Sequence, residues 1–244
     1  MLRSTSMKRY QSGLSLIELM VGITVGMIVV AGASLMMTSQ VSEHRRLTLE
    51  TQIQQDLRAV ADLMVREVRR AGSWSIPQKG IWAPATATLP SGTAMSNPYL
   101  SDDEFSVTTV NGNEVLRYSY AKHAERLGTP SPAEDNVVDP DTEQFGFKLD
   151  SGTIKFLLGG NWQPMTDRTT LNVTGLRITV NSQENSLADS CENLCDPTSG
   201  TCPTQTQRRL NIELSGQSAH DAAVTRVLRL SARLRNDAIT GACP

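Results

Sequence analysis

The chain has 244 residues, of which 20% are charged and 5% aromatic, and its formal net charge at pH 7 is −2. This length accommodates one well-packed domain and one additional element. The charge balance argues against a protein built mainly to hold nucleic acid, since such proteins carry a basic excess or stripe. Residues 1–13 contain Arg3, Lys8 and Arg9 and no acid, so their loss would change the net charge from −2 to −5.

An apolar run follows this basic leader. From Leu19 to Ser42 the chain has 24 residues without a charge. As a helix they extend over about 36 Å, enough to cross a hydrocarbon core of about 30 Å. The run exceeds the about 7–15 apolar residues of a secretory signal peptide. No polar face interrupts it, as one would in a helix buried within a soluble domain. We predict a membrane-spanning helix, with basic residues on both sides that leave its orientation open.

A motif at the start of the run decides the orientation. The leader is followed directly by the sequence GLSLIEL at residues 13–19, which resembles the type IV prepilin signal. The resemblance implies that a prepilin peptidase cuts on the cytoplasmic side between Gly13 and Leu14, and that Leu14 is then N-methylated. Glu18 becomes the fifth residue of the mature chain. The chain departs from the family's usual pattern in starting the mature protein with leucine instead of phenylalanine.

Glu18 is the one charge in an apolar segment. A carboxylate at the bilayer centre costs on the order of 2.5–3.5 kcal/mol, so such residues normally face a partner. The nearest cation after cleavage is the amino group of Leu14, about 6 Å away along a helix. The pairing is easier between two staggered helices than within one. In the resembling family it brings a subunit into register with its neighbour. The alternative is a carboxylate that reaches the cytoplasmic surface.

Gly22 and Gly26 form a GxxxG step within the run. Small residues allow helix backbones to approach closely in lipid. We therefore predict a helix-packing face there. The alternative is that glycine is simply common in membrane helices.

The helical pattern continues beyond the apolar run. Apolar residues recur at three- and four-residue steps, which is typical of an amphipathic helix with one buried stripe. We predict one helix from Leu14 to Ala71, ended by Gly72 in a left-handed conformation. Residues 14–42 belong in lipid or a filament core, and residues 43–72 continue into the head. The stripe consists of Leu49, Ile53, Leu57, Val60, Met64 and Val68.

Residues 73–244 read as a periplasmic, β-rich head. Residues 73–103 predict an irregular crossover. Two hairpins are indicated, 105–110 with 114–120 around Asn111-Gly112-Asn113, and 145–149 with 153–158 around Asp150-Ser151-Gly152. Period-two alternation predicts three further strands, at 176–180, 210–214 and 228–235. We expect an α+β fold in which one antiparallel sheet packs on the helix stripe.

Four cysteines lie near the C-terminus: Cys191, Cys195, Cys202 and Cys243. An even number in a polar region indicates disulfides formed in an oxidising compartment such as the periplasm. Each of the three possible connectivities ties Cys243 back to the 191–202 loop. The alternative is zinc, but the C-x3-C-x6-C spacing lacks the paired C-x2-C of most zinc sites.

The sequence offers little for catalysis. The three histidines are scattered, and no nucleophile–base or phosphate-loop pattern occurs, so we expect neither an enzyme nor a cofactor. Asp139, Asp141 and Glu143 are candidate calcium ligands, with a solvated acidic loop as the alternative. A basic strip could capture DNA, although a solvated sheet face balanced by acids is the preferred interpretation. That strip comprises Arg208, Arg209, Arg229, Arg233 and Arg235.

Taken together, the motif and the predicted layout are similar to type IV pilins. The size, the REVRRAG helix end at 66–72 and the cysteine-bearing C-terminal part resemble minor pilins of the PilW type. The resemblance implies a structural protein that helps to initiate a type IV pilus, with twitching motility and DNA uptake as outcomes of the filament. Implied partners are minor and major pilins, the peptidase and the inner-membrane assembly machinery. The protein would be single-pass in the bacterial inner membrane before it enters the pilus near its tip. The alternative is a GspJ-like minor pseudopilin of type II secretion.

Overall fold

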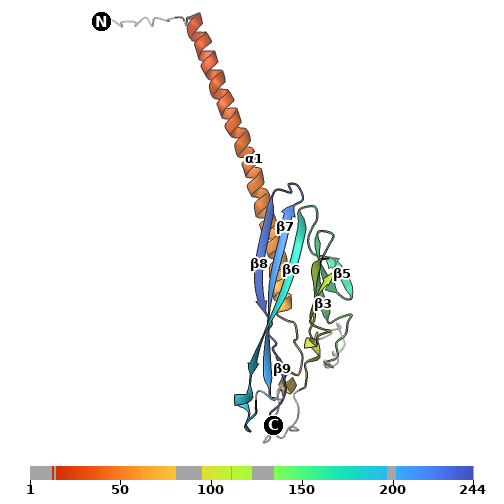
Figure 1. Ribbon diagram of the computed structural model, residues 1–244. Helices are drawn as coiled ribbons and strands as arrows, with labels where there is room; N and C mark the ends of the chain where they lie inside the picture. Colours follow the sequence, from red (N-terminus) through yellow and green to blue (C-terminus); the bar gives the residue numbers. More distant parts are fainter. Residues whose placement is uncertain are drawn as a thin grey trace, which may run out of the picture. The chain divides into compact units, whose positions relative to one another are not determined.

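The computed structural model describes residues 13, 15–80, 95–110, 112–122, 135–196 and 202–243. The chain divides into two compact units, Met1–Thr48 and Leu49–Pro244. Its elements are one long α-helix followed by short 3-10 turns and antiparallel strands, which confirms the predicted α+β class (Figure 1).

Helix α1 runs from Leu16 to Val68 without a break. Its second part buries the predicted stripe, with Ile53, Leu57 and Met64 at most 2% exposed. The helix ends three residues earlier than predicted, because residues 69–72 form a turn. Gly72 has φ +73 as predicted, and a Cβ there would lie 2.4 Å from a methyl carbon of Leu100. The position therefore requires glycine for its conformation and for the space around it.

The first sheet has five strands in the order β1-β2-β3-β4-β5, all antiparallel. Both predicted hairpins are present. Val110 pairs with Asn113 in the first, and Asp150 pairs with Thr153 in the second. Ser151 and Gly152 both have positive φ (53° and 78°), the geometry of a type I′ turn. The strands are β1 (Ser106–Val110), β2 (Asn113–Ser119), β3 (Gln144–Asp150), β4 (Thr153–Leu158) and β5 (Asn161–Pro164).

The second sheet is a separate antiparallel assembly in the order β6-β7-β8, with β9 paired to β7. The expectation of a single sheet was therefore wrong. Alternation shows which face of a strand is buried, but it does not show which strands share hydrogen bonds. The strands are β6 (Leu171–Ser186), β7 (Thr204–Ser218), β8 (Thr225–Arg233) and β9 (Ala238–Thr240).

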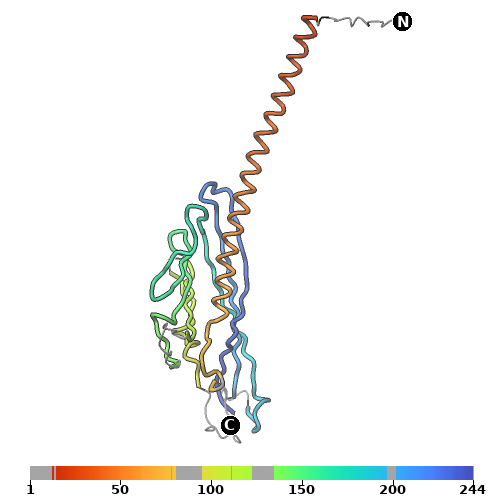
Figure 2. The backbone as a smooth tube through the Cα atoms, turned by 180° about the vertical axis from the view of Figure 1, so that it is seen from behind, coloured from red at the N-terminus to blue at the C-terminus, as the bar shows by residue number. Residues whose placement is uncertain are grey.

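One apolar core joins the helix segment 49–68 to both sheets. On the second sheet, a Cβ at Gly216 would lie 3.4 Å from a methyl carbon of Leu57, so the helix approaches the sheet closely there. The opposed views of Figures 1 and 2 show this helix segment behind β6–β8 in one and in front of them in the other. The first sheet contributes stacked aromatic rings, among them Tyr118 on Phe145 and on Phe147. The head thus folds around the second part of α1.

Candidate assembly site on the N-terminal helix

The predicted processing site precedes α1 in the sequence. Gly13 is exposed, and Leu14 lies outside the described residues. The helix begins at Leu16, and the N–H of Leu19 donates to the carbonyl of Ser15 (3.1 Å). Glu18 is exposed in the first helical turn, where the positive end of the helix dipole favours a carboxylate.

The first part of α1 presents apolar side chains on all its faces. Leu16, Ile28 and Leu35 are between 72% and 76% exposed. Large exposed apolar surfaces mark contact with a membrane or with other chains. Other large hydrophobic residues at least half exposed here are Ile17, Leu19, Met20, Val21, Ile23, Val25, Met27, Val29, Val30, Met36, Met37, Val41 and Leu47.

The hydroxyl groups within this surface are already hydrogen-bonded to the helix. Thr24 donates to the carbonyl of Val21 (2.9 Å), and Ser34 donates to that of Val30 (2.8 Å). Thr38, Ser39 and Ser42 bond backward in the same way. Because these donors find partners within the helix, they need no water and are compatible with an apolar environment.

Gly22 and Gly26 leave open backbone on this helix. A Cβ built at either glycine meets no atom within 4 Å. The head therefore does not explain the two glycines, and the GxxxG packing face stays a prediction. Among the described residues, α1 is the one helix that is long and apolar enough to cross a membrane.

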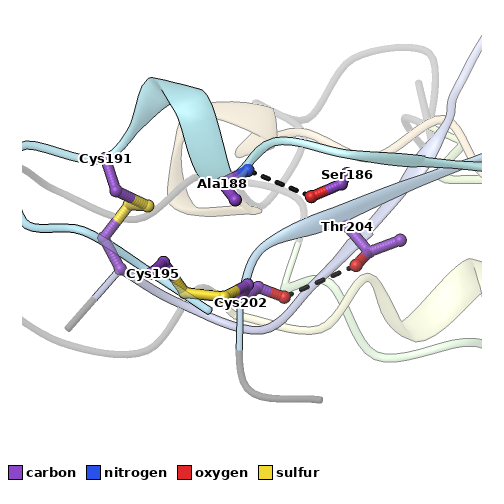
Figure 3. The surroundings of a disulfide bond; sticks show 7 residues. Ser186, Ala188, Cys191, Cys195, Cys202 and Thr204 are labelled. Atoms are coloured by element: carbon purple, nitrogen blue, oxygen red, sulfur yellow. Dashed lines mark hydrogen bonds between the residues drawn. A yellow bond between two sulfur atoms is a disulfide. The ribbon is translucent and has the colours of Figure 1, made fainter. Parts of the chain in front are cut away.

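Two disulfides close the C-terminal part of the head. Cys191 is bonded to Cys243, and Cys195 to Cys202, and no cysteine is free. The structure thus contains the predicted disulfides and selects one of the three open connectivities. Figure 3 shows Cys195 joined to Cys202 next to the hydrogen bond from the Thr204 hydroxyl to the Cys202 carbonyl. All four cysteines are in disulfides, so none has a thiolate to ligate zinc.

The family model described as Prepilin peptidase-dependent protein B matches residues 46–234, more than half of the chain. The chain belongs to the prepilin peptidase-dependent protein B family. A second model, the prokaryotic N-terminal methylation motif, matches residues 8–34 and so includes Gly13, Leu14 and Glu18. Neither a curated protein nor a solved structure matches the chain. The two matched families are pilin-type structural proteins, and the apolar helix with the methylation motif fits membrane anchoring.

In this prepilin peptidase-dependent protein, the calcium candidates are engaged with the protein itself. Glu143 is 3% exposed, and its carboxylate accepts hydrogen bonds from the Tyr99 hydroxyl (2.9 Å) and the Lys122 N–H (2.9 Å). It also accepts from the N–H of Asp139 (3.0 Å), whose own carboxylate accepts from the N–H of Asp141 (2.9 Å). No group of three metal-ligating side chains occurs in the described part of the chain. These contacts give Glu143 a structural role that the sequence did not indicate.

The proposed basic strip is divided by the fold. Arg209 in β7 and Arg233 in β8 are cross-strand neighbours, and Arg229 lies four residues before Arg233 in β8. Arg208 instead donates to the Leu100 carbonyl (3.4 Å). Arg229 is paired with Glu213 (2.8 Å), and Arg233 with Asp237 (3.0 Å). The strip is thus shorter than predicted and partly neutralised.

Sequence reasoning missed a polar cluster at the end of α1. The Glu67 carboxylate accepts a hydrogen bond from the Tyr120 hydroxyl (3.2 Å) and lies 3.4 Å from a guanidinium nitrogen of Arg70. Burial, and then the charge of Glu67, raise the pKa of Tyr120. The same two causes raise the pKa of Tyr118 well above its usual value. The predicted strand 114–120 contains both tyrosines, but nothing in the sequence joined them to Glu67.

Proposed function

We propose that this protein is a minor pilin of a type IV pilus, of the PilW type, and that it helps to initiate assembly of the filament. The observation that carries the proposal is the surface of α1 from Leu16 to Leu47, which is apolar, exposed and without a charge before Glu43 except Glu18. Such a surface needs lipid before assembly and other helices afterwards. The methylation motif at 8–34 supports processing by a prepilin peptidase.

In this proposal the unprocessed chain is held in the inner membrane with its head in the periplasm. Cleavage after Gly13 exposes the amino group of Leu14, and Glu18 pairs with the corresponding group of a neighbouring subunit. Gly22 and Gly26 allow the two helices to approach closely. The two disulfides support a periplasmic head, since disulfides form in oxidising compartments. The partners are minor and major pilins and the assembly machinery of the inner membrane.

The same chemistry suits a minor pseudopilin of type II secretion, so the test must separate two filament systems. The gene is deleted, and surface pili and secreted proteins are measured in the same cells, with the wild-type gene restored as the control. We expect pili and twitching to disappear while secretion continues. Loss of secreted enzymes with normal pili would assign the protein to the secretion system instead. No loss of either would count against both assignments.

A DNA receptor is the competing function of another class. Proteins that hold DNA through phosphate contacts lose affinity steeply with salt. The fold pairs Arg229 and Arg233 with acids, which reduces the available positive charge, and Arg208 donates to a backbone carbonyl. The full-length protein in detergent is therefore expected to pass through a DNA column at about 0.15 M salt, the physiological ionic strength. Salt-dependent retention would favour the receptor.

A further inference from the structure

A basic groove lies at the end of α1, away from the candidate assembly site. We use this name for the hollow of about 560 Å³ lined by Asp62, Val65, Arg66, Arg69, Arg70 and Arg235. The first five residues come from the last turns of α1 and the turn that follows it. Arg235 comes from the chain just after β8. Four guanidinium groups therefore meet one carboxylate in the lining.

Only part of this positive charge is balanced within the protein. One carboxylate oxygen of Glu67 lies 3.6 Å from a guanidinium nitrogen of Arg66, and the other lies 3.4 Å from a guanidinium nitrogen of Arg70. The Arg70 guanidinium also lies over the ring of Tyr120, 4.2 Å from its centroid. Within the described residues, the exposed side chains of Arg69 and Arg235 have neither a hydrogen-bond nor an ion-pair partner. Two guanidinium groups are thus available to a ligand.

Capping of the helix does not explain these arginines. Basic side chains near a helix C-terminus often bond to its last carbonyl groups. Here the carbonyls of Val65, Glu67 and Val68 already accept backbone N–H groups from the following turn. The carbonyl of Ala71 accepts from the side-chain amide of Asn236 (3.1 Å). Capping of these carbonyl groups therefore does not account for the arginines of the groove.

We propose that the basic groove binds the carboxylates of an acidic segment on a companion pilin subunit, an inference that rests on the proposed function. The planar guanidinium group matches a carboxylate with two parallel hydrogen bonds, and Arg69 and Arg235 are free to make them. The carboxylate of Asp62 in the same lining repels a continuous phosphate backbone. It can accept a hydrogen bond from a peptide N–H, or form an ion pair with a basic side chain, next to an acidic residue of a peptide. The mixed lining favours a protein segment over a nucleic acid.

The first test measures binding of a defined acidic probe to the full-length protein in detergent. The probe is a fluorescein-labelled peptide of alternating Asp and Glu, followed by anisotropy, with an Asn/Gln peptide of the same length as the neutral control. Charge reversal by Arg69→Glu with Arg235→Glu should weaken binding at least about tenfold, since it replaces two charge-assisted hydrogen-bond donors with groups that repel the acidic peptide. The matched control is Arg58→Glu, an exposed arginine of the same helix outside the groove, and should not change binding.

Competition separates the sources of the anion. Inorganic phosphate and a single-stranded DNA of equal charge are added to the bound peptide. We expect neither to displace it at concentrations where unlabelled acidic peptide does. Displacement by DNA at lower concentration than by peptide would overturn the choice of a protein partner. Equal affinity of the wild type and the Arg69→Glu, Arg235→Glu variant would overturn the groove itself, provided tryptophan fluorescence shows that both are folded.

The second test is made in cells, where the amounts of processed protein in the membrane and in sheared filaments are compared. The groove variant should be processed and inserted normally but be depleted from filaments, while Arg58→Glu enters them. If the groove variant also enters normally, the groove proposal fails and the pilin function stands. If the wild-type protein is never found with filaments, the proposed function fails. The anisotropy measurement then still tests whether the groove binds acidic peptide.

Discussion

Arg226 in β8 forms an ion pair with Glu50 in α1, two residues separated by 176 positions in the chain. The pair joins the first turn of the buried helix segment to the edge strand of the second sheet. The side chains of Arg226 and Glu50 are 41% and 20% exposed, so both charges are partly shielded from water. It is a specific polar contact between two elements otherwise joined through apolar packing.

Glu50→Gln should lower the free energy of unfolding of the head by roughly 0.5–1 kcal/mol, the upper part of the range for exposed ion pairs. The measurement is denaturant unfolding in detergent, followed by tryptophan fluorescence. The signal reports on the head because all three tryptophans, Trp74, Trp82 and Trp162, follow residue 48. The control is Arg229→Gln, which removes the more exposed pair with Glu213 and should cause no measurable change. An equal loss in both variants would show that burial of the Glu50 pair adds nothing.

The two disulfides should contribute unequally to stability. Cys191 and Cys243 are 52 positions apart, whereas Cys195 and Cys202 are 7 apart. On the chain-entropy account, the longer closure stabilises by about 4 kcal/mol and the shorter by about 2 kcal/mol. Replacing each pair by alanine and measuring denaturant unfolding tests this order. A larger loss for the Cys195–Cys202 pair would show that local packing, and not loop closure, sets the contribution.

The features that were predicted correctly depend on residues close together in the sequence. The stripe from Ile53 to Val68 has the helical period, and it is buried as expected. Gly152 and Gly72 marked a tight turn and a helix end because few other residues adopt their backbone conformation. The motif at residues 13–19 predicted a pilin-type protein, because it is a linear sequence pattern and does not depend on the fold of the head.

Long-range features had no such signal. The outer parts of β6 and β7, Ser182–Ser186 paired with Thr204–Arg208, are polar on both faces, so their alternation is hidden. The short strands β5 and β9 have four and three residues, too few for a pattern. Arg66, Arg69 and Arg70 fit the solvated face of a helix. Only the structure brings Arg235, 165 positions after Arg70, into the same groove.

Tyr118 in β2 and Tyr120 just after this strand are both buried, but only one of their hydroxyl groups has a hydrogen-bond partner in the described part of the chain. The hydroxyl of Tyr118 is buried without a protein partner among the described residues, whereas that of Tyr120 donates to Glu67. At neutral pH, Tyr120→Phe should cost about 1 kcal/mol through the lost hydrogen bond, and Tyr118→Phe should cost nothing measurable or stabilise. Denaturant unfolding compares the two. A larger cost for Tyr118→Phe would indicate a partner for its hydroxyl.

The same tyrosines predict loss of stability in alkali. Burial and then Glu67 raise the pKa of both residues, so the folded state holds their protons more tightly than the unfolded state does. Their contribution is complete below the unfolded pKa of about 10 and is lost as the pH rises above it towards the folded values. Free energies of unfolding measured from pH 8 upward should therefore fall above about pH 10. The fall should be smaller in Tyr118→Phe, and an equal fall in that variant would assign it to other groups.

Processing can be tested at Gly13. Because the prepilin signal is read at this glycine, Gly13→Ala should leave the leader in place, giving a larger protein on immunoblots of native cells. The control is Ser12→Ala, which keeps the glycine and should be cut normally. Mass spectrometry of the mature wild-type protein should show a chain that begins with N-methylated Leu14. A mature protein of normal size from Gly13→Ala would disprove the assigned cut.

Glu18 tests the register of assembly separately from insertion. Removing the carboxylate makes the first turn of α1 more apolar, so Glu18→Ala should insert in the membrane and be cut as the wild type is. In the proposed filament, however, the amino group of a neighbouring Leu14 then lacks its partner in apolar surroundings, where an unpaired charge costs several kcal/mol. The variant should be depleted from sheared filaments at least about tenfold, which corresponds to about 1.4 kcal/mol. Glu43→Ala is the matched control, because Glu43 is exposed on the same helix just beyond the apolar run. Equal incorporation of Glu18→Ala and Glu43→Ala, measured as the ratio of filament to membrane protein, would leave Glu18 without a role in register.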